Sequence, residues 1–248
     1  AVRPCVCASC RKSMEEQGLD PEVPEDVLKM GEQTYKNYCE KTREIIHKYN
    51  PNATIYHNGG HTIRGRRDLM HYNTHLELES LPTAGWGYDH FPMSAAYART
   101  TGMDFLGMTG KFHTSWGEFG GYKHPNALRY EVALSIACGA KCSIGDQAHP
   151  SVKMNMATYD LIGAAYSEVE KKEKWCDNVT TVADIALLSH EAAMLYSIQK
   201  EELGDTGASR ILLEGKYLYD IIDTQADLSK YKLVILPDEI RLMSWPVN

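Results

Sequence analysis

The stretch that decides the fold is Thr74-His75-Leu76-Glu77-Leu78-Glu79-Ser80. Successive side chains of a β-strand point to opposite faces, so His75, Glu77 and Glu79 share one face and the two leucines share the other. Other short apolar runs are predicted to be strands at residues 53–57, 104–109 and 141–144. Helical patterns precede, separate and follow these strands, at residues 24–49, 91–101, 126–138 and 156–172. This alternation predicts a parallel sheet in an α/β protein.

Polar side chains end or follow each of the four predicted strands. They are His57 and Asn58; His75, Glu77 and Glu79; Lys111 and His113; and Asp146, Gln147 and His149. A (β/α)8 barrel builds its active site from several strand ends, whereas an open doubly wound sheet binds its ligand at one switch point. Four polar ends in a row therefore favour the barrel. Because a closed barrel has eight strands, residues 1–178 are predicted to be the C-terminal half of a TIM barrel.

Residues 179–248 are predicted to be the start of a flavodoxin-like domain. Residues 184–189 and 232–236 are predicted to be strands, and 207–222 a helix that starts near Ser209. Two strands and one helix cannot bury both faces of a sheet. The sequence therefore predicts a fragment, cut at both ends or completed by another chain.

The composition excludes several classes of protein. With 43% hydrophobic and 24% charged residues, the 248-residue chain is typical of globular proteins. Its net charge of -7 and its lack of long Lys and Arg runs argue against a nucleic-acid partner. No stretch approaches the ~18 apolar residues of a membrane span, and the start lacks the apolar core of a secretory signal. A cytoplasmic protein with no membrane partner is expected.

Two segments rich in glycine and aromatic residues predict a sugar-binding site. Residues 107–121 contain five glycines together with His113, Trp116 and Glu118, and residues 83–90 contain Trp86 and Tyr88. Aromatic rings can cover the apolar face of a pyranose, and the His and Glu side chains can bind its hydroxyl groups. The alternative is that the two tryptophans only pack their loops onto the barrel rim.

The carboxylates of Glu77 and Glu79 are candidates for acid/base catalysis. If the two leucines contact the outer helices, both carboxylates point into the barrel, where burial shifts a pKa or demands a partner. A general acid needs such a shift. The alternative is a solvent-exposed edge strand with one polar face.

Cys5, Cys7 and Cys10 are spaced closely enough to share one ion. Structural zinc takes four such ligands, and the fourth could be Cys39, a water or a residue upstream. Unligated reduced thiols, or redox chemistry at the Cys7-x-x-Cys10 pair, are the alternatives. Because seven cysteines are present, an odd number, a disulfide scaffold is not expected.

Three long motifs carry a family resemblance. They are residues 74–82 with Gly85-Trp86-Gly87-Tyr88, residues 106–121, and Cys142-Ser143-Ile144-Gly145-Asp146-Gln147 with His149-Pro150. They resemble the hypothetical glycosyl hydrolase family that includes the α-L-fucosidases of glycoside hydrolase family 151. The tail from Val182 resembles the flavodoxin-like "β-galactosidase trimerisation" domain of those proteins and of family 42 β-galactosidases.

The resemblance implies a retaining, exo-acting glycosidase with a carbohydrate substrate and no catalytic cofactor. Its nucleophilic Asp would end a strand upstream of Ala1, and Glu79, or failing it Glu77, would be the acid/base. The cysteine trio resembles the zinc cluster of family 42. A dimer or trimer is implied, and β-galactosidase-like specificity or a non-catalytic carbohydrate-binding or assembly fragment are the alternatives. The expected substrate-binding residues are His75, Trp86, Tyr88, His113, Trp116, Glu118, Asp146 and His149.

Overall fold

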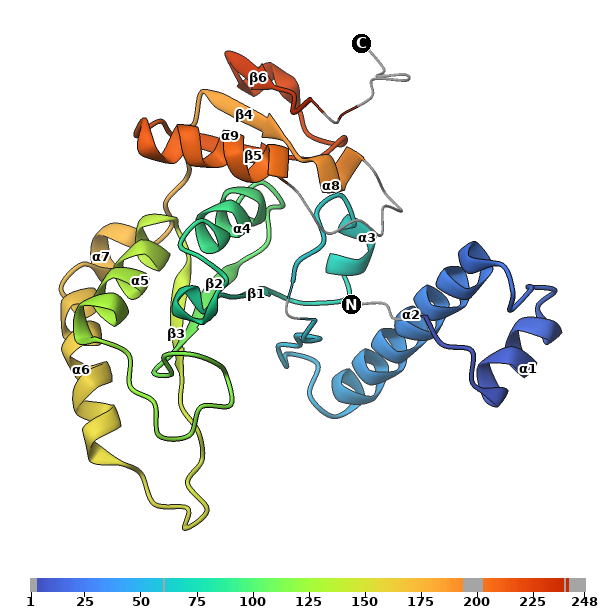
Figure 1. Ribbon diagram of the computed structural model, residues 1–248, viewed down its shortest axis with the longest axis horizontal. Helices are drawn as coiled ribbons and strands as arrows, with labels where there is room; N and C mark the ends of the chain where they lie inside the picture. The colour runs from blue at the N-terminus through green and yellow to red at the C-terminus, as the bar shows by residue number, and fades with distance from the viewer. Residues whose placement is uncertain (1–3, 60, 194–202, 239, 241–248) are drawn as a thin grey trace. The chain divides into compact units, whose positions relative to one another are not determined.

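A computed structural model describes residues 4–59, 61–193, 203–238 and 240 (Figure 1). The chain divides into two compact units, one comprising Ala1–His61 with Asp68–Thr74 and the other Thr62–Arg67 with His75–Asn248. No helix in the described part of the chain is both long and apolar enough to cross a membrane.

The first unit is built around a long helix, α2 (Pro24–Tyr49), preceded by α1 (Ala8–Glu16). Pro24 occupies the first turn of α2 with Glu25 and Asp26, and His47 and Lys48 lie in its last turn. Acidic side chains at the start and basic side chains at the end of a helix both interact favourably with its dipole. Proline in the first turn also favours a helix start at this point. The helix predicted at residues 24–49 is confirmed.

The strand predicted at residues 53–57 is wrong, because this extended segment joins no sheet in the structure. The backbone N–H of Ile55 donates to Oγ1 of Thr74 at 2.8 Å, and that of His57 donates to Oδ1 of Asn73 at 2.7 Å. Side-chain oxygens thus accept hydrogen bonds from backbone N–H groups that, in a sheet, would donate to a neighbouring strand.

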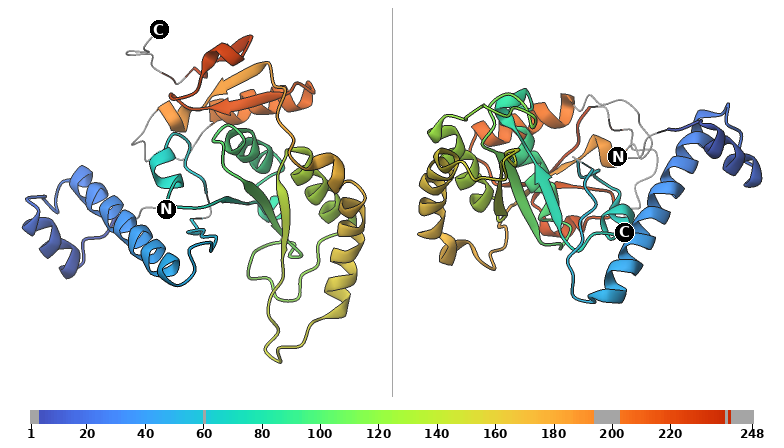
Figure 2. Two further views of the ribbon diagram at one scale, coloured as in Figure 1. Left: turned by 180° about the vertical axis from the view of Figure 1, so that it is seen from behind. Right: turned by 90° about the horizontal axis from the view of Figure 1, so that it is seen from below.

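In the second unit, a parallel sheet contains β1 (Leu76–Glu79), β2 (Phe105–Gly110) and β3 (Lys141–Gly145) in that order. The connections contain the short 3₁₀ helix η1 (Pro82–Ala84), α4 (His90–Ala98) and α5 (Pro125–Ala137). Three of the four predicted strands are therefore adjacent and parallel, as expected. Figure 2 shows these strands beside the helices of the same unit.

One face of this sheet is buried against helices. Leu76 and Leu78 are 1% and 3% exposed, whereas Glu77 and Glu79 are partly exposed, which confirms the predicted alternation. Gly107 lies on the buried face, where an added Cβ would come within 2.5 Å of Ser135 Oγ and 2.7 Å of the Phe91 ring. This close approach of α4 and α5 requires glycine. The core continues into α6 (Met156–Glu170), which α7 (Glu173–Cys176) follows.

A second parallel sheet follows, with β4 (Ile185–Leu188) between β5 (Tyr219–Ile222) and β6 (Leu233–Ile235). Its helices are α8 (His190–Ala193), α9 (Leu203–Glu214) and the 3₁₀ helix η2 (Leu228–Lys230). The helix predicted at residues 207–222 is wrong in its second half, and the sheet has three strands where two were predicted. The helix ends because Lys216 adopts a φ of 60°, which reverses the chain before β5.

Charged side chains join the second sheet to α4. Arg99 Nε donates to Asp220 Oδ1 at 2.7 Å, and the Tyr97 hydroxyl donates to Asp223 Oδ2 at 2.8 Å. Arg67 Nε, at the start of α3 (Arg67–Met70), also donates to Asp223 at 2.6 Å. Because Asp220 and Asp223 are almost fully buried, these bonds supply the partners that buried carboxylates require.

Candidate active site

The polar face of the first sheet carries the candidate catalytic residues. In the strand register Glu79 is level with Met108, and Met108 is level with Ser143. Cys142 and Ile144 pack against the helical core, so Ser143 and Gly145 lie on the opposite face. Glu77 and Glu79 lie on that same opposite face, at the carboxyl end of β1. This is the edge at which parallel sheets place their ligands.

Glu77 is held by a histidine. His75 Nε2 lies 2.9 Å from Glu77 Oε1, and the two side chains are 22% and 24% exposed. A carboxylate paired in this way is fixed in position. Glu79 lies two residues further along the strand, closer to the sheet edge that carries the loops.

The aromatic rings of Phe112 and Trp116 pack over the ends of β2 and β3. Gly110 and Gly145 are paired in register, and an added Cβ on Gly110 would collide with the Phe112 ring. An added Cβ on Gly145 would lie 3.1 Å from the Trp116 ring. The two rings pack edge to face with centroids 5.7 Å apart. The glycines therefore make the room that the aromatic rings occupy.

Glu118 bonds within its own loop. Its Oε2 accepts the backbone N–H groups of His113 at 2.9 Å and Thr114 at 2.6 Å. The bond from the Thr114 backbone holds the pKa of Glu118 below its usual range. His113 is also fixed through its carbonyl oxygen, which accepts a bond from the Thr83 hydroxyl. These contacts give Glu118 a part in shaping the loop.

Lys111 is a buried cation at this edge that the sequence did not single out for a role. It is 3% exposed, and its Nζ donates to the Phe119 carbonyl oxygen at 3.0 Å. The same Nζ lies 4.0 Å from Asp146 Oδ1 and 4.7 Å from the centre of the Tyr122 ring. In the sequence, the signal for a role of Lys111 is its position directly after a buried strand. In the structure, its ammonium group places a positive charge close to Asp146.

His149 lies in the loop after β3, on the exposed surface. Its Nδ1 is 2.6 Å from Ser151 Oγ, and its ring centre is 5.6 Å from that of Phe119. This contact brings the loops after β2 and β3 together.

Trp86 and Tyr88 offer partly exposed rings. Trp86 is 36% exposed and packs its ring at 5.0 Å from that of His90. Tyr88 is 42% exposed, and burial of part of its ring raises the pKa of its hydroxyl. Exposed rings of this kind can contact the apolar face of a sugar.

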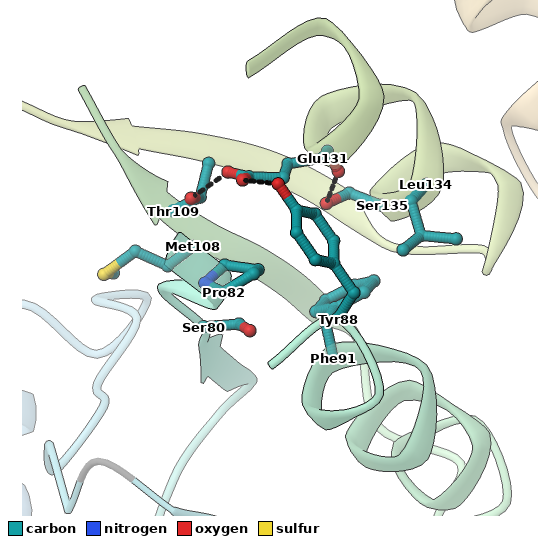
Figure 3. Close-up of a pocket in the computed structure, with 9 residues that line it drawn as sticks. All are labelled: Ser80, Pro82, Tyr88, Phe91, Met108, Thr109, Glu131, Leu134 and Ser135. Atoms are coloured by element: carbon teal, nitrogen blue, oxygen red, sulfur yellow. Dashed lines mark hydrogen bonds between the residues drawn. The ribbon is translucent and has the colours of Figure 1, made fainter. Parts of the chain in front are cut away.

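A small pocket lies on the helix side of the sheet, next to Tyr88 (Figure 3). Its polar centre is Glu131 of α5, which is 5% exposed and accepts a bond from Thr109 Oγ1 at 2.6 Å. Lys123, 1% exposed, donates to the same oxygen at 2.5 Å. No pattern in the sequence pointed to this buried ion pair, because charged residues are usually exposed. The lining residues are Ser80, Pro82, Tyr88, Phe91, Met108, Thr109, Glu131, Leu134 and Ser135.

In the first unit, Cys5, Cys7 and Cys10 converge, with sulfur atoms within 4.8 Å of one another. Tetrahedral zinc with bonds of ~2.3 Å needs sulfurs about 3.8 Å apart, so the trio needs little movement to bind zinc. A hydrogen bond from the Cys10 backbone lowers the pKa of Cys7 to about 7, whereas the hydrogen bond with the Cys5 side chain raises the pKa of Cys10 to about 11, so Cys7 is favoured as the thiolate of the two. Cys39 is buried in α2 and is not one of the three converging thiols among the described residues.

Comparison with solved structures relates the chain to glycosidases. It matches α-L-fucosidase isoenzyme 2 from Paenibacillus thiaminolyticus with 57% identity and a TM-score of 0.92, over 97% of this chain and 38% of that one. A β-galactosidase from Bacillus circulans sp. alkalophilus matches at 14% identity and a TM-score of 0.67, over 86% of this chain and 36% of that one. A cold-adapted β-galactosidase from Rahnella sp. R3 matches at 15% identity and a TM-score of 0.54, over 68% and 30%.

These matches differ in what they show. The β-galactosidases share the fold alone, because their identities are low. The fucosidase shares sequence and structure over nearly the whole chain, and the chain spans 38% of its length. No protein-family model matches the sequence, and no curated protein matches it.

Proposed function

We propose that this chain, a glycosyl hydrolase sequence related to the α-L-fucosidases, forms part of a retaining enzyme that releases terminal α-linked L-fucose. The observation that carries the proposal is the 57% identity to a fucosidase over almost the entire chain. The polar face of the first sheet supports it, because two carboxylates and loops rich in aromatic residues meet at one edge. The substrate class is a carbohydrate.

Residues 1–178 are proposed to be the C-terminal half of a (β/α)8 barrel, and residues 179–248 the start of a flavodoxin-like domain. Three adjacent parallel strands with intervening helices support the first part. The second sheet supports the second part, because its first strand lies between the next two, as in doubly wound folds. A dimer or trimer of the longer protein is part of the proposal.

Glu79 is proposed to be the acid/base, with Glu77 as the second candidate. In a retaining reaction a carboxylate nucleophile attacks the anomeric carbon while the acid protonates the departing oxygen. The deprotonated acid then removes a proton from the water that hydrolyses the glycosyl-enzyme. The nucleophile is proposed to be an Asp upstream of Ala1, about 5 Å from Glu79. His75 would hold Glu77 in place, at 2.9 Å.

The rim residues are proposed to bind the sugar. The exposed rings of Trp86 and Tyr88 suit its apolar face, while His113, Asp146 and His149 offer polar groups to its hydroxyls. Trp116 lies over the ends of the strands, and Glu118 holds the loop that carries Trp116. No cofactor takes part in this chemistry.

Cys5, Cys7 and Cys10 are proposed to bind a structural zinc ion, with a fourth ligand from outside the trio. Zinc would tie the start of α1 to the segment before it, and no catalytic step involves it. If the proposal is correct, metal analysis of purified protein finds close to one zinc per chain, and Cys7→Ser with Cys10→Ser abolishes it. A metal-free wild-type protein would show that the thiols are unligated.

The test of the function is an assay of the full-length protein that carries this chain. Glu79→Gln should lower kcat by several orders of magnitude for substrates with poor leaving groups, and much less for activated aryl fucosides, because only poor leaving groups need protonation. Glu77→Gln is the matched comparison. Equal losses on both substrate types would make Glu79 a positioning residue. Turnover of β-galactosides in preference to fucosides would assign the other sugar, and no turnover would favour a binding role.

A further inference from the structure

Two buried polar atoms lie in the loops that follow β2 and β3. The indole Nε1 of Trp116 and the side-chain Oε1 of Gln147 have no hydrogen-bond partner among the residues that the structure describes. The first atom is a donor and the second an acceptor. A buried polar group without a partner destabilises the folded state. The two atoms together therefore indicate a group that binds here.

The two side chains are joined to each other. Gln147 Nε2 donates to the Trp116 carbonyl oxygen at 3.2 Å, which sets the orientation of the amide, because a flipped amide would oppose two oxygens. The Trp116 ring packs against Phe112 and Gly145, at the carboxyl end of β3. Gly145 lies on the sheet face that carries Glu79. The pair is thus placed at the edge of the proposed active site.

We propose that Trp116 and Gln147 together bind one hydroxyl group of the sugar, which makes them specificity-determining residues. The indole N–H donates to the hydroxyl oxygen, and the hydroxyl proton is donated to Oε1 of Gln147. One hydroxyl group satisfies both atoms, because it accepts and donates at once. Both residues are partly exposed, so the two covered atoms lie close to the surface of these loops. The inference rests on the proposed function and assigns Trp116 a hydrogen-bonding role besides packing.

Neighbouring polar groups already have hydrogen-bond partners within these loops. The Gln147 backbone N–H donates to Asp146 Oδ1 at 2.7 Å, and Lys111 Nζ donates to the Phe119 carbonyl oxygen at 3.0 Å. Glu118 accepts two backbone bonds within its loop. A trapped water offers the same chemistry as a sugar hydroxyl, so the experiment has to separate the two.

The test uses the full-length protein, with an aryl α-L-fucoside and its 2-, 3- and 4-deoxy analogues as substrates. Trp116→Phe keeps a ring and removes the N–H, and Gln147→Met keeps the length and removes the acceptor. Each is expected to lower kcat/KM for the parent fucoside about tenfold, equivalent to one hydrogen bond of ~1.4 kcal/mol. Trp175→Phe is the control, because this tryptophan is 71% exposed on α7.

The deoxy analogues distinguish sugar from water. For one analogue, the wild-type enzyme should show the tenfold loss, and the two variants should lose nothing further. The inference would be overturned if the two variants lost activity equally on the parent and on every analogue, or lost none. Thermal unfolding of each variant identifies losses of activity that are caused by misfolding. A wild-type protein inactive on all fucosides and galactosides would refute the proposed function, and this inference with it.

Discussion

The buried pair Lys123 and Glu131 shows how much a single residue contributes. Lys123 also donates to Thr109 at 2.9 Å, and its backbone N–H bonds the Lys111 carbonyl oxygen at 2.7 Å, so it closes the base of the aromatic loop. Burial lowers the pKa of Lys123, although Glu131 beside it opposes that shift. The two charges are tolerated in the interior because they satisfy each other.

Lys123→Met should lower the free energy of unfolding by about 3–5 kcal/mol, because it leaves Glu131 buried without its counter-charge. The double variant Lys123→Met with Glu131→Leu should recover most of that loss. Urea denaturation measures both. Lys141→Met, which removes an exposed ion pair with Asp177, should leave the free energy of unfolding almost unchanged. A double variant as unstable as the single one would contradict this account.

The Glu118 bonds predict a pH dependence of the loop. A carboxyl whose pKa is lowered in the folded state contributes its bonds above the ordinary Glu pKa and loses them as the pH falls through the lowered value. The amides of His113 and Thr114 should therefore keep their protection factors against hydrogen exchange down to a pH below ~4.3, and these factors, taken relative to the intrinsic exchange rate, should fall at still lower pH. Glu118→Gln should remove the dependence. If the loss of amide protection had its midpoint at or above the ordinary Glu pKa, the assignment of this pH dependence to Glu118 would be refuted.

At the scale of elements, the sequence predicted what local patterns encode. The alternation from Leu76 to Glu79 reports which face is buried, and the proline and charges of α2 fix both its ends. Prediction from the sequence failed where the structure of a segment depends on partners that are distant in the chain. Residues 219–222 form a fully buried strand, and Asp220 within it is bonded by Arg99 and by Tyr231. An apolar run with one charged residue gives no sign of such partners.

In the functional site, too, residues marked by local patterns could be predicted from the sequence, and residues that depend on distant partners could not. Trp116 and Glu118 stood out because of their residue types and neighbours. Lys123 and Glu131 did not, because their importance depends on burial and on bonds to other elements. The extended segment at residues 53–57 is a related case, since Asn73 and Thr74 side chains bond its backbone in place of a strand.

A turn after β3 provides a prediction at the same scale. Val152 is 90% exposed and has a φ of 57°, a conformation that β-branched residues rarely adopt. Val152→Gly should stabilise the protein by about 0.5–1 kcal/mol, because relief of strain outweighs the entropy that glycine adds to the unfolded chain. Val182→Gly, at a position 76% exposed and without positive φ, should destabilise by a similar amount. Thermal unfolding compares the two, and a destabilising Val152→Gly would contradict the argument.

At the scale of the whole molecule, the first sheet has two open edges. Within the described residues, β1 and β3 each pair only with β2, so each has one edge whose backbone groups are open to another strand. β3 is partly exposed along most of its length. Open parallel edges of this kind promote pairing with other chains.

The last prediction is that the 248-residue chain alone hydrolyses no glycoside and associates with itself. In the proposed half-barrel, three strands supply only part of the rim, and the proposed nucleophile is outside these 248 residues, so we expect no glycosyl-enzyme to form on this chain. Glu118 cannot substitute, because its carboxylate is bonded to its own loop. Turnover of aryl fucosides and galactosides, together with light scattering, decides the matter. Rapid turnover by a monodisperse monomer would disprove both the placement of the nucleophile and the half-barrel.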